Sequence, residues 1–324
     1  MNKILLSHVD LDGCGIIVLA EYFHRYLLFD DILMLDYDFE KNENIVDYIN
    51  DYSEIVIADL TLPEEDLKKF KSNVSLFDHH SETEWISSYN DSVWDKNRCG
   101  TKIFWEEYVK PRIKRYPPIV DYFVDLVNVY DQWNLESNLW EEAKNLNSVL
   151  YGLKNYSSPE NYGKALPFFH LMKTKFDKLK EWRWTSKEQR IIESSKEKED
   201  AIFEKCKNHI SIRVDSQKKL FGVIMLSSKI SLVASRILHE FENLDYLVAI
   251  NSYGGVQGKL SLRSKNGFNC NNIHVAKGHD AAAGARLSVE DTKRFWEEND
   301  LALKYNIQIT DDESELIEKV VQEI

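Results

Sequence analysis

Two short stretches of the sequence concentrate side chains of the kinds that bind divalent cations. The first is SHVDLDG (7–13) and the second is FDHH (77–80). Their candidate ligands are His8, Asp10, Asp12, Asp78, His79 and His80. Imidazole nitrogens and carboxylate oxygens without a thiolate favour Mn²⁺, and less often Co²⁺, Fe²⁺ or Mg²⁺. The residue types therefore predict a metal centre, provided that the fold brings the two stretches together.

Two further aspartates stand in comparable places. Asp59 lies near the end of the apolar run SEIVIADL, and Asp131 lies in VYDQW. The set that could bind metal is then His8, Asp10, Asp12, Asp59, His79 and Asp131. It suffices for two divalent ions that share one carboxylate. Two ions about 3.5–4 Å apart can activate a hydroxide and clamp a phosphoryl group, so the chemistry that fits is hydrolysis of a phosphoester.

Each aspartate taken alone has a simpler interpretation. An aspartate at the end of a strand commonly caps a helix or completes a turn. Clustered or buried like charges, however, are costly without a metal ion or a charged partner. If the fold gathers all six side chains, the metal centre is the better interpretation.

The surrounding elements predict how these side chains meet. Buried strands are expected over 3–7, 31–39, 53–60 and 73–80, with helices between them. Strands that are apolar along their length are typical of a parallel sheet covered by helices on both faces. Functional groups collect at the carboxyl ends of such strands. His8, Asp59 and His79 all stand at predicted carboxyl ends, so we expect them at one edge of the sheet.

The whole chain is expected to be an α/β protein in three parts. These are an α/β domain over 1–150, a helical connector over 151–208 and a smaller α/β domain over 209–324. Helices are expected over 100–110 and 119–133. The stretch 165–210 is charged, with apolar residues three and four apart, which is typical of an amphipathic helix or helix pair. The last segment, 313–324, is expected to form a surface helix.

The composition limits the partners. The formal net charge is −13, so stable binding along duplex nucleic acid is not expected. Four widely spaced cysteines predict neither a disulfide framework nor a zinc motif. The apolar part of the N-terminus is too short for a signal peptide, and no stretch is apolar enough to span a bilayer. We expect a cytoplasmic protein, monomeric or homodimeric, without membrane association.

Motifs at both ends of the chain resemble a known family. In order, SHVDLDG, IADL, FDHH and VNVYDQW resemble the motifs of the DHH phosphoesterase family. SLRS (261–264) and GHDAAAG (278–284) resemble the DHHA1-type substrate-binding domain that is often fused to it. The first and fourth motifs are most similar to those of the nano-RNase B branch, which degrades very short RNAs. The resemblance implies a parallel-sheet DHH domain and a smaller α/β DHHA1-type domain joined by a helical connector.

The resemblance also implies a role for each matching residue in the metal centre. One Mn²⁺ would be held by His8, Asp10 and Asp59. The other would be held by Asp12, Asp59, His79 and Asp131, with Asp59 bridging. Asp78 would orient an imidazole through its second nitrogen, and His80 would contact the scissile phosphate and stabilise its charge.

In the smaller domain, the resemblance implies a grip on the substrate phosphate. The matching residues are Arg263, Gly278, His279 and Gly284. The guanidinium fork suits phosphate, and the glycines allow a close approach of the backbone. The chain departs from the family where a run of glycines before the histidine is replaced by Ala-Lys-Gly (276–278). Arg98, in RCGT (98–101), is expected either to touch phosphate or to form an ordinary surface ion pair.

We therefore expect a Mn²⁺-dependent phosphodiesterase that hydrolyses short 5′-phosphorylated oligonucleotides to mononucleotides with a metal-activated hydroxide. Alternatives with the same chemistry are a phosphodiesterase for linear or cyclic dinucleotides, a nucleoside bisphosphate phosphatase and a single-stranded DNA exonuclease. The alternative from another class is a non-catalytic nucleotide-binding protein on the same fold.

Overall fold

The chain forms two compact units, Met1–Glu193 and Ser194–Ile324, in a computed structural model. The structure describes residues 2–36, 45–70, 73–215, 219–226, 228–251, 258–265, 267–273, 277–279, 281–287 and 307–308. The boundary between the units lies within one helix, α9 (Ser186–Cys206). The segment predicted as a connector, 151–208, is therefore divided between the two units.

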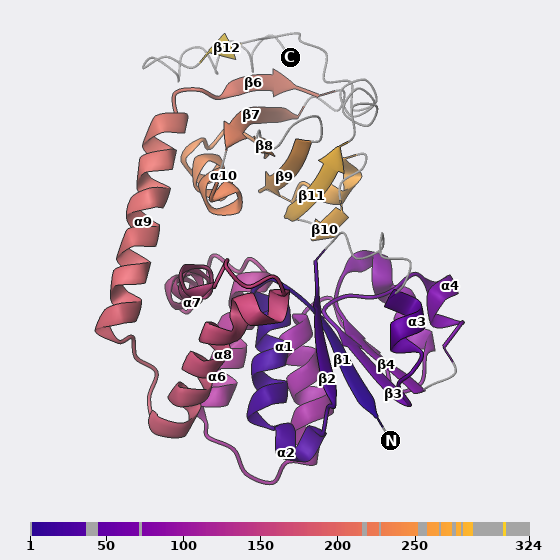
Figure 1. Cartoon of the computed structure of the whole chain (residues 1–324). Helices are drawn as coiled ribbons and strands as arrows, with labels where there is room; N and C mark the ends of the chain where they lie inside the picture. Colours follow the sequence, from indigo (N-terminus) through magenta and orange to yellow (C-terminus); the bar gives the residue numbers. More distant parts are fainter. Residues whose placement is uncertain are drawn as a thin grey trace. The chain divides into compact units, whose positions relative to one another are not determined.

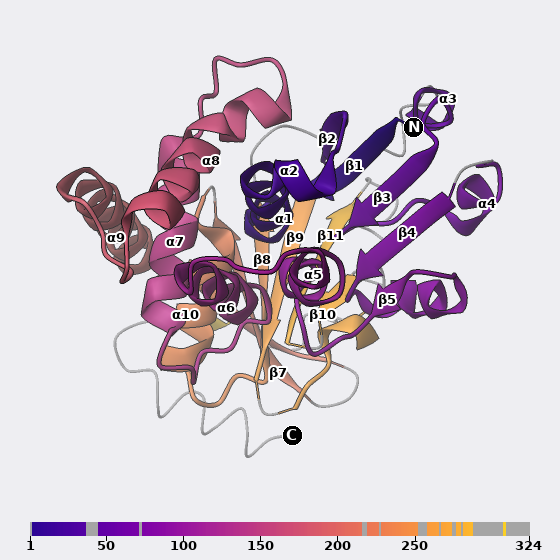
Figure 2. The same cartoon turned by 90° about the horizontal axis from the view of Figure 1, so that it is seen from below.

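The first unit is built on a five-stranded sheet in which all neighbouring strands are parallel (Figure 1). The strands are β1 (Lys3–His8), β2 (Asp31–Leu35), β3 (Glu54–Ala58), β4 (Asn73–Asp78) and β5 (Val93–Trp94). Their order is β2-β1-β3-β4-β5, which can be followed in Figure 2. The predicted α/β fold with a parallel sheet is confirmed. Strand β2 ends at Leu35, and residues 37–39 of that prediction lie outside the described residues.

Alternate residues of the strands enter two separate cores. Leu5 and Val56 belong to the larger core, whereas Ile4 and Ile55 belong to the core on the opposite face. The larger core is covered by α1 (Leu11–Tyr22), α2 (His24–Leu27), α5 (Gly100–Ile103), α6 (Ile119–Asp131), α7 (Trp140–Leu153) and α8 (Asn161–Lys178). The other is covered by α3 (Ile45–Ile49), α4 (Glu64–Leu67) and the 3₁₀ turn Ser81–Ser88. This two-sided burial explains why the strands are apolar throughout.

The helices differ from the prediction mainly at their ends. The helix expected over 100–110 is α5 followed by a π-helical turn, Phe104–Val109, and a 3₁₀ turn, Lys110–Arg112. The charged stretch 165–210 is a helix pair, α8 and α9. The break is fixed because Glu188 accepts a hydrogen bond from Thr185 N at 2.5 Å and pairs with buried Lys175 at 3.0 Å. A carboxylate in this position caps the start of α9.

The second unit is built on a mixed sheet with the order β10-β11-β9-β8-β7-β6-β12. Its strands are β6 (Ser211–Val214), β7 (Leu220–Leu226), β8 (Tyr246–Asn251), β9 (Gly258–Ser264), β10 (Lys277–His279), β11 (Ala282–Leu287) and β12 (Ile307–Gln308). Only the pair β7 and β8 is parallel within the described part of this sheet, and α10 (Ile230–Glu240) joins these two strands. The smaller α/β unit predicted from the sequence is therefore present.

Two further predictions concern helices. Among the residues that the structure describes, no helix is both long and apolar enough to cross a membrane. The surface helix predicted over 313–324 lies outside the described residues.

Candidate metal centre

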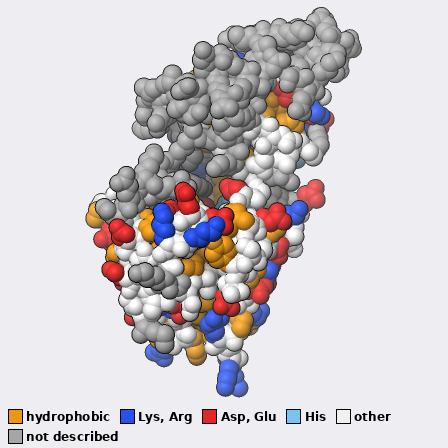
Figure 3. Space-filling view, turned by 90° about the vertical axis from the view of Figure 1, so that its right-hand side faces the viewer, with side chains coloured by type: hydrophobic (Ala, Val, Ile, Leu, Met, Phe, Trp, Pro, Cys, Tyr) orange, Lys and Arg blue, Asp and Glu red, His pale blue; other side chains and the backbone are white. Residues whose placement is uncertain are grey.

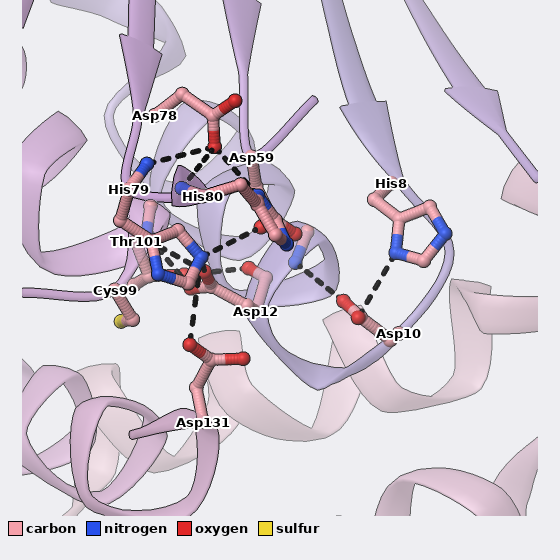
Figure 4. Close-up of polar contacts among 12 residues, drawn as sticks. His8, Asp10, Asp12, Asp59, Asp78, His79, His80, Cys99, Thr101 and Asp131 are labelled. Atoms are coloured by element: carbon pink, nitrogen blue, oxygen red, sulfur yellow. Dashed lines mark hydrogen bonds and ion pairs between the residues drawn. The ribbon is translucent and has the colours of Figure 1, made fainter. Parts of the chain in front are cut away.

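The carboxyl edge of the first sheet carries the predicted ligands. His8 is the last residue of β1, and Asp59 directly follows β3. Asp10 and Asp12 lie at the start of α1, and Asp131 is the last residue of α6. Figure 4 shows these side chains gathered with the two histidines that follow β4. Three strand ends and two helix ends thus contribute to one site.

The imidazole of His79 faces three carboxylates. Its Nε2 lies 3.4 Å from Asp59 Oδ1, 3.5 Å from Asp12 Oδ2 and 3.5 Å from Asp131 Oδ2. The side chains of His79 and Asp12 are fully buried, and that of Asp131 is 19% exposed. Three acids converging on one ring nitrogen are more than a helix cap or turn requires, and they are typical of a cation site.

A second group of ligand atoms lies beside the first. Single ligand atoms of His8, Asp10 and Asp59 all lie within 4.8 Å of one another. His8 Nδ1 is 2.9 Å from Asp10 Oδ2, while Asp10 Oδ1 caps α1 by accepting a hydrogen bond from Gly13 N at 3.1 Å. Asp10 therefore caps α1 with one carboxylate oxygen while its other oxygen faces His8. Asp59 belongs to this group, and its Oδ1 also lies 3.4 Å from His79 Nε2. Single ligand atoms of Asp59, Asp78, His79 and His80 form a further group within 4.8 Å of one another.

The backbone around Asp59 is unusual. Its φ of 61° lies in the left-handed region, which aspartate, asparagine and glycine adopt more readily than other residues. A Cβ at Gly100 would lie 2.7 Å from Asp59 Cβ and 3.1 Å from Asp12 Oδ2. Gly100 therefore allows the start of α5 to approach the centre closely. Such constraints concentrate at functional sites, because the surrounding structure must hold them in place.

Asp12 is fixed by the RCGT segment. Its Oδ2 accepts a hydrogen bond from Gly100 N at 2.6 Å, and its Oδ1 accepts one from Thr101 N at 2.7 Å. Thr101 Oγ1 also donates to the Asp12 carbonyl at 2.5 Å. The sequence analysis did not identify Gly100 and Thr101 as residues that position Asp12. Their signal in the sequence is the segment RCGT (98–101), whose small residues follow the FDHH motif.

Asp78 and His80 form a pair at the edge of the centre. Asp78 Oδ1 lies 2.8 Å from His80 Nδ1 and also accepts from His79 N at 2.8 Å. Burial lowers the pKa of His80, but the Asp78 carboxylate outweighs burial and raises this pKa to about 10. Burial raises the pKa of Asp78, but His80 outweighs it and lowers this pKa to about 2. The contact with Asp78 therefore favours the imidazolium form of His80, and 29% of the His80 side chain is exposed.

The protonation preferences of Asp59, Asp131 and His79 are those expected of ligands that bind cations. Burial and then repulsion from Asp12 raise the pKa of both Asp59 and Asp131 well above the ordinary value. Burial and the charge of His80 lower the pKa of His79, which keeps its imidazole neutral, as a ligand must be. Asp59 Oδ2 is buried without a hydrogen-bond partner. Divalent cations would relieve the repulsion and satisfy this oxygen, so the residues fit an oxygen-preferring divalent metal.

Two other residues that sequence reasoning missed contact the centre from outside the ligand set. Gln132 Nε2 lies 3.3 Å from His79 Nδ1. Lys154 Nζ donates a hydrogen bond to the carbonyl of Val9, between His8 and Asp10, at 3.1 Å. The sequence signal for Gln132 is its place inside the motif VYDQW. Lys154 carries no signal in the sequence, because it lies 145 residues from its partner.

Arg98 is engaged by three carboxylates. Its guanidinium lies 2.7 Å from Asp95, 2.7 Å from Glu106 and 2.8 Å from Glu107. Of the two roles that the sequence left open, these contacts support the ion pair. They neutralise the charge that a phosphate contact would need.

In the second unit, strand register places the predicted substrate residues in one region. Arg263 of β9 and His279 of β10 are both opposite Ala282 of the intervening strand β11. Arg263 is buried, and its Nη1 donates to the carbonyl of Leu262 at 2.7 Å. Gly278 has a φ of 142°, which other residues rarely adopt. The structure therefore brings Arg263, Gly278, His279 and Gly284 together on three neighbouring strands, although the side chain of His279 is outside the described part.

Comparisons with known proteins place the fold. No protein-family model matches the sequence, and no curated protein matches it. Among solved structures, the DHH domain of a member of the s1p family of ribosomal proteins is 15% identical, with a TM-score of 0.63 over 94% of this chain and 87% of that chain. Exonuclease RecJ bound to manganese is 14% identical, with a TM-score of 0.51 over 94% of this chain and 90% of that chain.

RecJ from Thermus thermophilus in complex with Mn²⁺ is 13% identical, with a TM-score of 0.53 over 95% of this chain and 53% of that chain. These similarities show that the chain has the fold of DHH-domain proteins, as the motif resemblance predicted. At this level of identity, they establish the fold alone. The nano-RNase B branch remains a prediction.

Proposed function

We propose that this protein is a Mn²⁺-dependent phosphodiesterase that hydrolyses short 5′-phosphorylated oligonucleotides to mononucleotides. The observation that carries the proposal is the shared position of Asp59, which contacts both groups of ligand atoms. One carboxylate between two sets of ligands is the arrangement that holds two neighbouring divalent ions. The Mn²⁺ complexes of RecJ, which have the same fold, support the choice of metal.

The residues have separate tasks in this proposal. One ion would be held by His8, Asp10 and Asp59, and the other by Asp12, Asp59, His79 and Asp131. When bound, the ions supply a nucleophile at neutral pH and neutralise charge on the phosphoryl oxygens. His80, protonated through Asp78, donates a hydrogen bond and positive charge to the scissile phosphate. Such a fixed cation stabilises charge that develops in the transition state.

The second unit is proposed to bind a phosphate group of the substrate. Arg263, Gly278, His279 and Gly284 are proposed to bind a substrate phosphate, because a guanidinium and strand backbone with little side-chain cover suit an anion. We also propose functional domains at 1–150 and 209–324, with 151–208 between them. The assignment of the metal-binding and phosphate-binding residues does not depend on where the domain boundaries are drawn.

Charge supports a short substrate. The net charge of −13 disfavours the extended phosphate contacts on which long nucleic acids depend. On the face shown in Figure 3, acidic and basic side chains of the described residues are interspersed. The few phosphates of a short oligonucleotide can be neutralised by the metal ions and a small number of cationic side chains. The protein is therefore better suited to a short oligonucleotide than to a long nucleic acid.

The test is hydrolysis of a substrate panel with Mn²⁺ and with EDTA. The panel holds a 5′-phosphorylated RNA dinucleotide, a five-mer, a 24-mer, single-stranded DNA, a cyclic dinucleotide and a nucleoside 3′,5′-bisphosphate. We expect metal-dependent release of mononucleotides, fastest from the two shortest RNAs. His79→Ala should abolish it, whereas His170→Ala, at an exposed position of α8, should not.

Other outcomes would redirect the proposal. Preference for the 24-mer or for DNA would indicate an exonuclease of longer substrates. Preference for the cyclic dinucleotide or the bisphosphate would indicate those activities. No hydrolysis by a protein that binds Mn²⁺ would contradict the proposal and favour a nucleotide-binding protein.

A further inference from the structure

Both halves of the metal centre are braced from outside the ligand set, by different residues. We propose that Gln132 and Lys154 are positioning residues that tune the two Mn²⁺ ions separately. Gln132 would set the affinity of the ion held with His79, and Lys154 that of the ion held with His8. The inference rests on the metal-binding part of the proposed function.

Gln132 contacts the back of His79. The Nε2 atom of His79 faces the carboxylates, so its Nδ1 points away from them and meets the Gln132 amide at 3.3 Å. When an imidazole binds a metal through Nε2, its Nδ1 carries the proton and needs an acceptor. The amide oxygen of Gln132 can take that place after rotation about one bond. Gln132 therefore orients the ring and stabilises the tautomer that binds metal.

The position of Gln132 is itself well fixed. It directly follows the ligand Asp131 and ends α6, and its N–H donates to the carbonyl of Asn128 at 3.0 Å. On the next residue, Trp133 packs against Trp140 of α7, with ring centroids 5.1 Å apart. This packing holds the segment that carries both the ligand and its neighbour.

Lys154 braces the other half. Its ammonium group donates to the Val9 carbonyl at 3.1 Å, and Val9 is the residue between the two ligands His8 and Asp10. The same ammonium lies 4.4 Å from the ring centroid of Tyr151, a cation–π contact that fixes the lysine side chain. Lys154 follows α7, whose residues Leu146 and Leu150 are fully buried. A rigid helix end therefore holds the backbone between two ligands.

The contacts of the two residues do not overlap. Among the described residues, Gln132 contacts a ligand of one group, and Lys154 contacts the loop that carries two ligands of the other. Residues that orient metal ligands typically contribute about 10- to 100-fold to metal affinity. Each residue should therefore affect one ion more than the other, although Asp59 links the two.

The test is a Mn²⁺ titration of the full chain, followed by the electron paramagnetic resonance signal of free Mn²⁺. We compare Gln132→Leu and Lys154→Met with two exposed control variants, Gln189→Leu and Lys173→Met. Wild type and controls should bind two ions. Each test variant should weaken one ion about 10-fold or more. Gln132→Glu and Lys154→Arg keep an acceptor and a donor, so they should restore binding and also show that a loss is not caused by misfolding.

Two backgrounds assign the ions. In His8→Ala, which loses the first ion, Gln132→Leu should still weaken the remaining ion while Lys154→Met should not. In Asp131→Ala the pattern should reverse. The inference is overturned if both variants weaken the same ion, or if both bind Mn²⁺ like the controls. If wild type itself binds no Mn²⁺, the metal-binding part of the proposed function fails as well.

Discussion

His79 and His80 are neighbours in the chain, with ring centroids 4.4 Å apart, yet their surroundings are opposite. His79 is buried among Asp12, Asp59 and Asp131, and its pKa is lowered. His80 is partly exposed and bonded to Asp78, and its pKa is raised. Two adjacent histidines therefore have opposite protonation preferences, because different neighbours surround them. In the proposed function, the ring with the lowered pKa would serve as a metal ligand, and the ring with the raised pKa would face the substrate.

The largest expected effect on hydrolysis comes from changing Asp59, one of the carboxylates around His79. Asp59→Asn keeps a residue that tolerates the left-handed backbone but removes the shared negative charge. We expect hydrolysis to fall by on the order of 1000-fold or more, because metal ions contribute several kcal/mol to such reactions. Steady-state rates with the RNA dinucleotide measure this loss. Activity within tenfold of wild type would contradict the role of Asp59.

The same variant should stabilise the protein without metal. Burial and repulsion from Asp12 raise the pKa of Asp59, so its ionised form opposes folding at neutral pH. Asparagine removes that cost. The melting temperature of Asp59→Asn in EDTA should therefore lie above that of wild type. A lower melting temperature would show that Asp59 stabilises the fold instead.

The next effect concerns the charged side of the comparison. Asp78→Asn removes the carboxylate that raises the pKa of His80 to about 10, and burial then lowers this pKa. The imidazolium would be lost at a much lower pH. We expect the alkaline limb of the rate–pH profile to shift toward neutral pH and the rate at pH 8 to fall about 100-fold. An unchanged alkaline limb would exclude His80 as the cation.

The stability linkage of this pair has a defined sign. The pKa of His80 is raised from 6.5 to about 10, so protonated His80 stabilises the fold. This contribution is fully present at a pH below 6.5 and is lost as the pH rises through about 10. The lowered pKa of Asp78 adds stability that is lost as the pH falls from 3.8 through about 2. Both contributions should be absent in Asp78→Asn, which thermal denaturation across pH can show.

A smaller effect is expected at Gly100, where the start of α5 approaches the centre. Gly100→Ala would place a methyl group 2.7 Å from Asp59 Cβ, and Asp59 or the start of α5 would have to move. Overpacking of this kind costs about 1–3 kcal/mol. We expect lower stability and weaker Mn²⁺ binding, measured by denaturant unfolding and titration. Wild-type stability and wild-type Mn²⁺ affinity would show that the start of α5 can shift without cost.

The smallest effect is expected from a substitution of Arg98, because it should not change the surroundings of His79 or His80. Its three carboxylate partners account for its charge. Arg98→Met should change stability by less than about 1 kcal/mol, as for other partly exposed ion pairs. The kcat/KM for the RNA dinucleotide should stay within about twofold of wild type. A large rise in KM would instead assign Arg98 to the substrate phosphate.

The fold of the first unit was predictable because its signals are local. Apolar runs such as KILLS and SEIVIA fill both faces of a parallel sheet, and polar residues follow directly at their carboxyl ends. His8, Asp59 and His79 were therefore found from their places in the sequence. The break between α8 and α9 was not, because the capping contact of Thr185 with Glu188 decides it.

The residues around the ligands were not predictable for a physical reason. Thr101 and Lys154 act through hydrogen bonds to residues 89 and 145 positions away. Such contacts depend on how helices pack against the sheet, so a local pattern such as RCGT can mark Thr101 but cannot identify its partner. Arg98 shows the converse case. Its residue type suits phosphate, but the turn and helix around it supply three acids.

The most direct test of the account compares His79→Ala with His80→Ala in one experiment. Both variants are titrated with Mn²⁺ and assayed with the 5′-phosphorylated RNA dinucleotide. The account predicts that both lose hydrolysis, that His79→Ala loses one ion, and that His80→Ala still binds two. If His80→Ala loses an ion, or if His79→Ala binds both with wild-type affinity, the division between a ligand histidine and a substrate histidine is wrong.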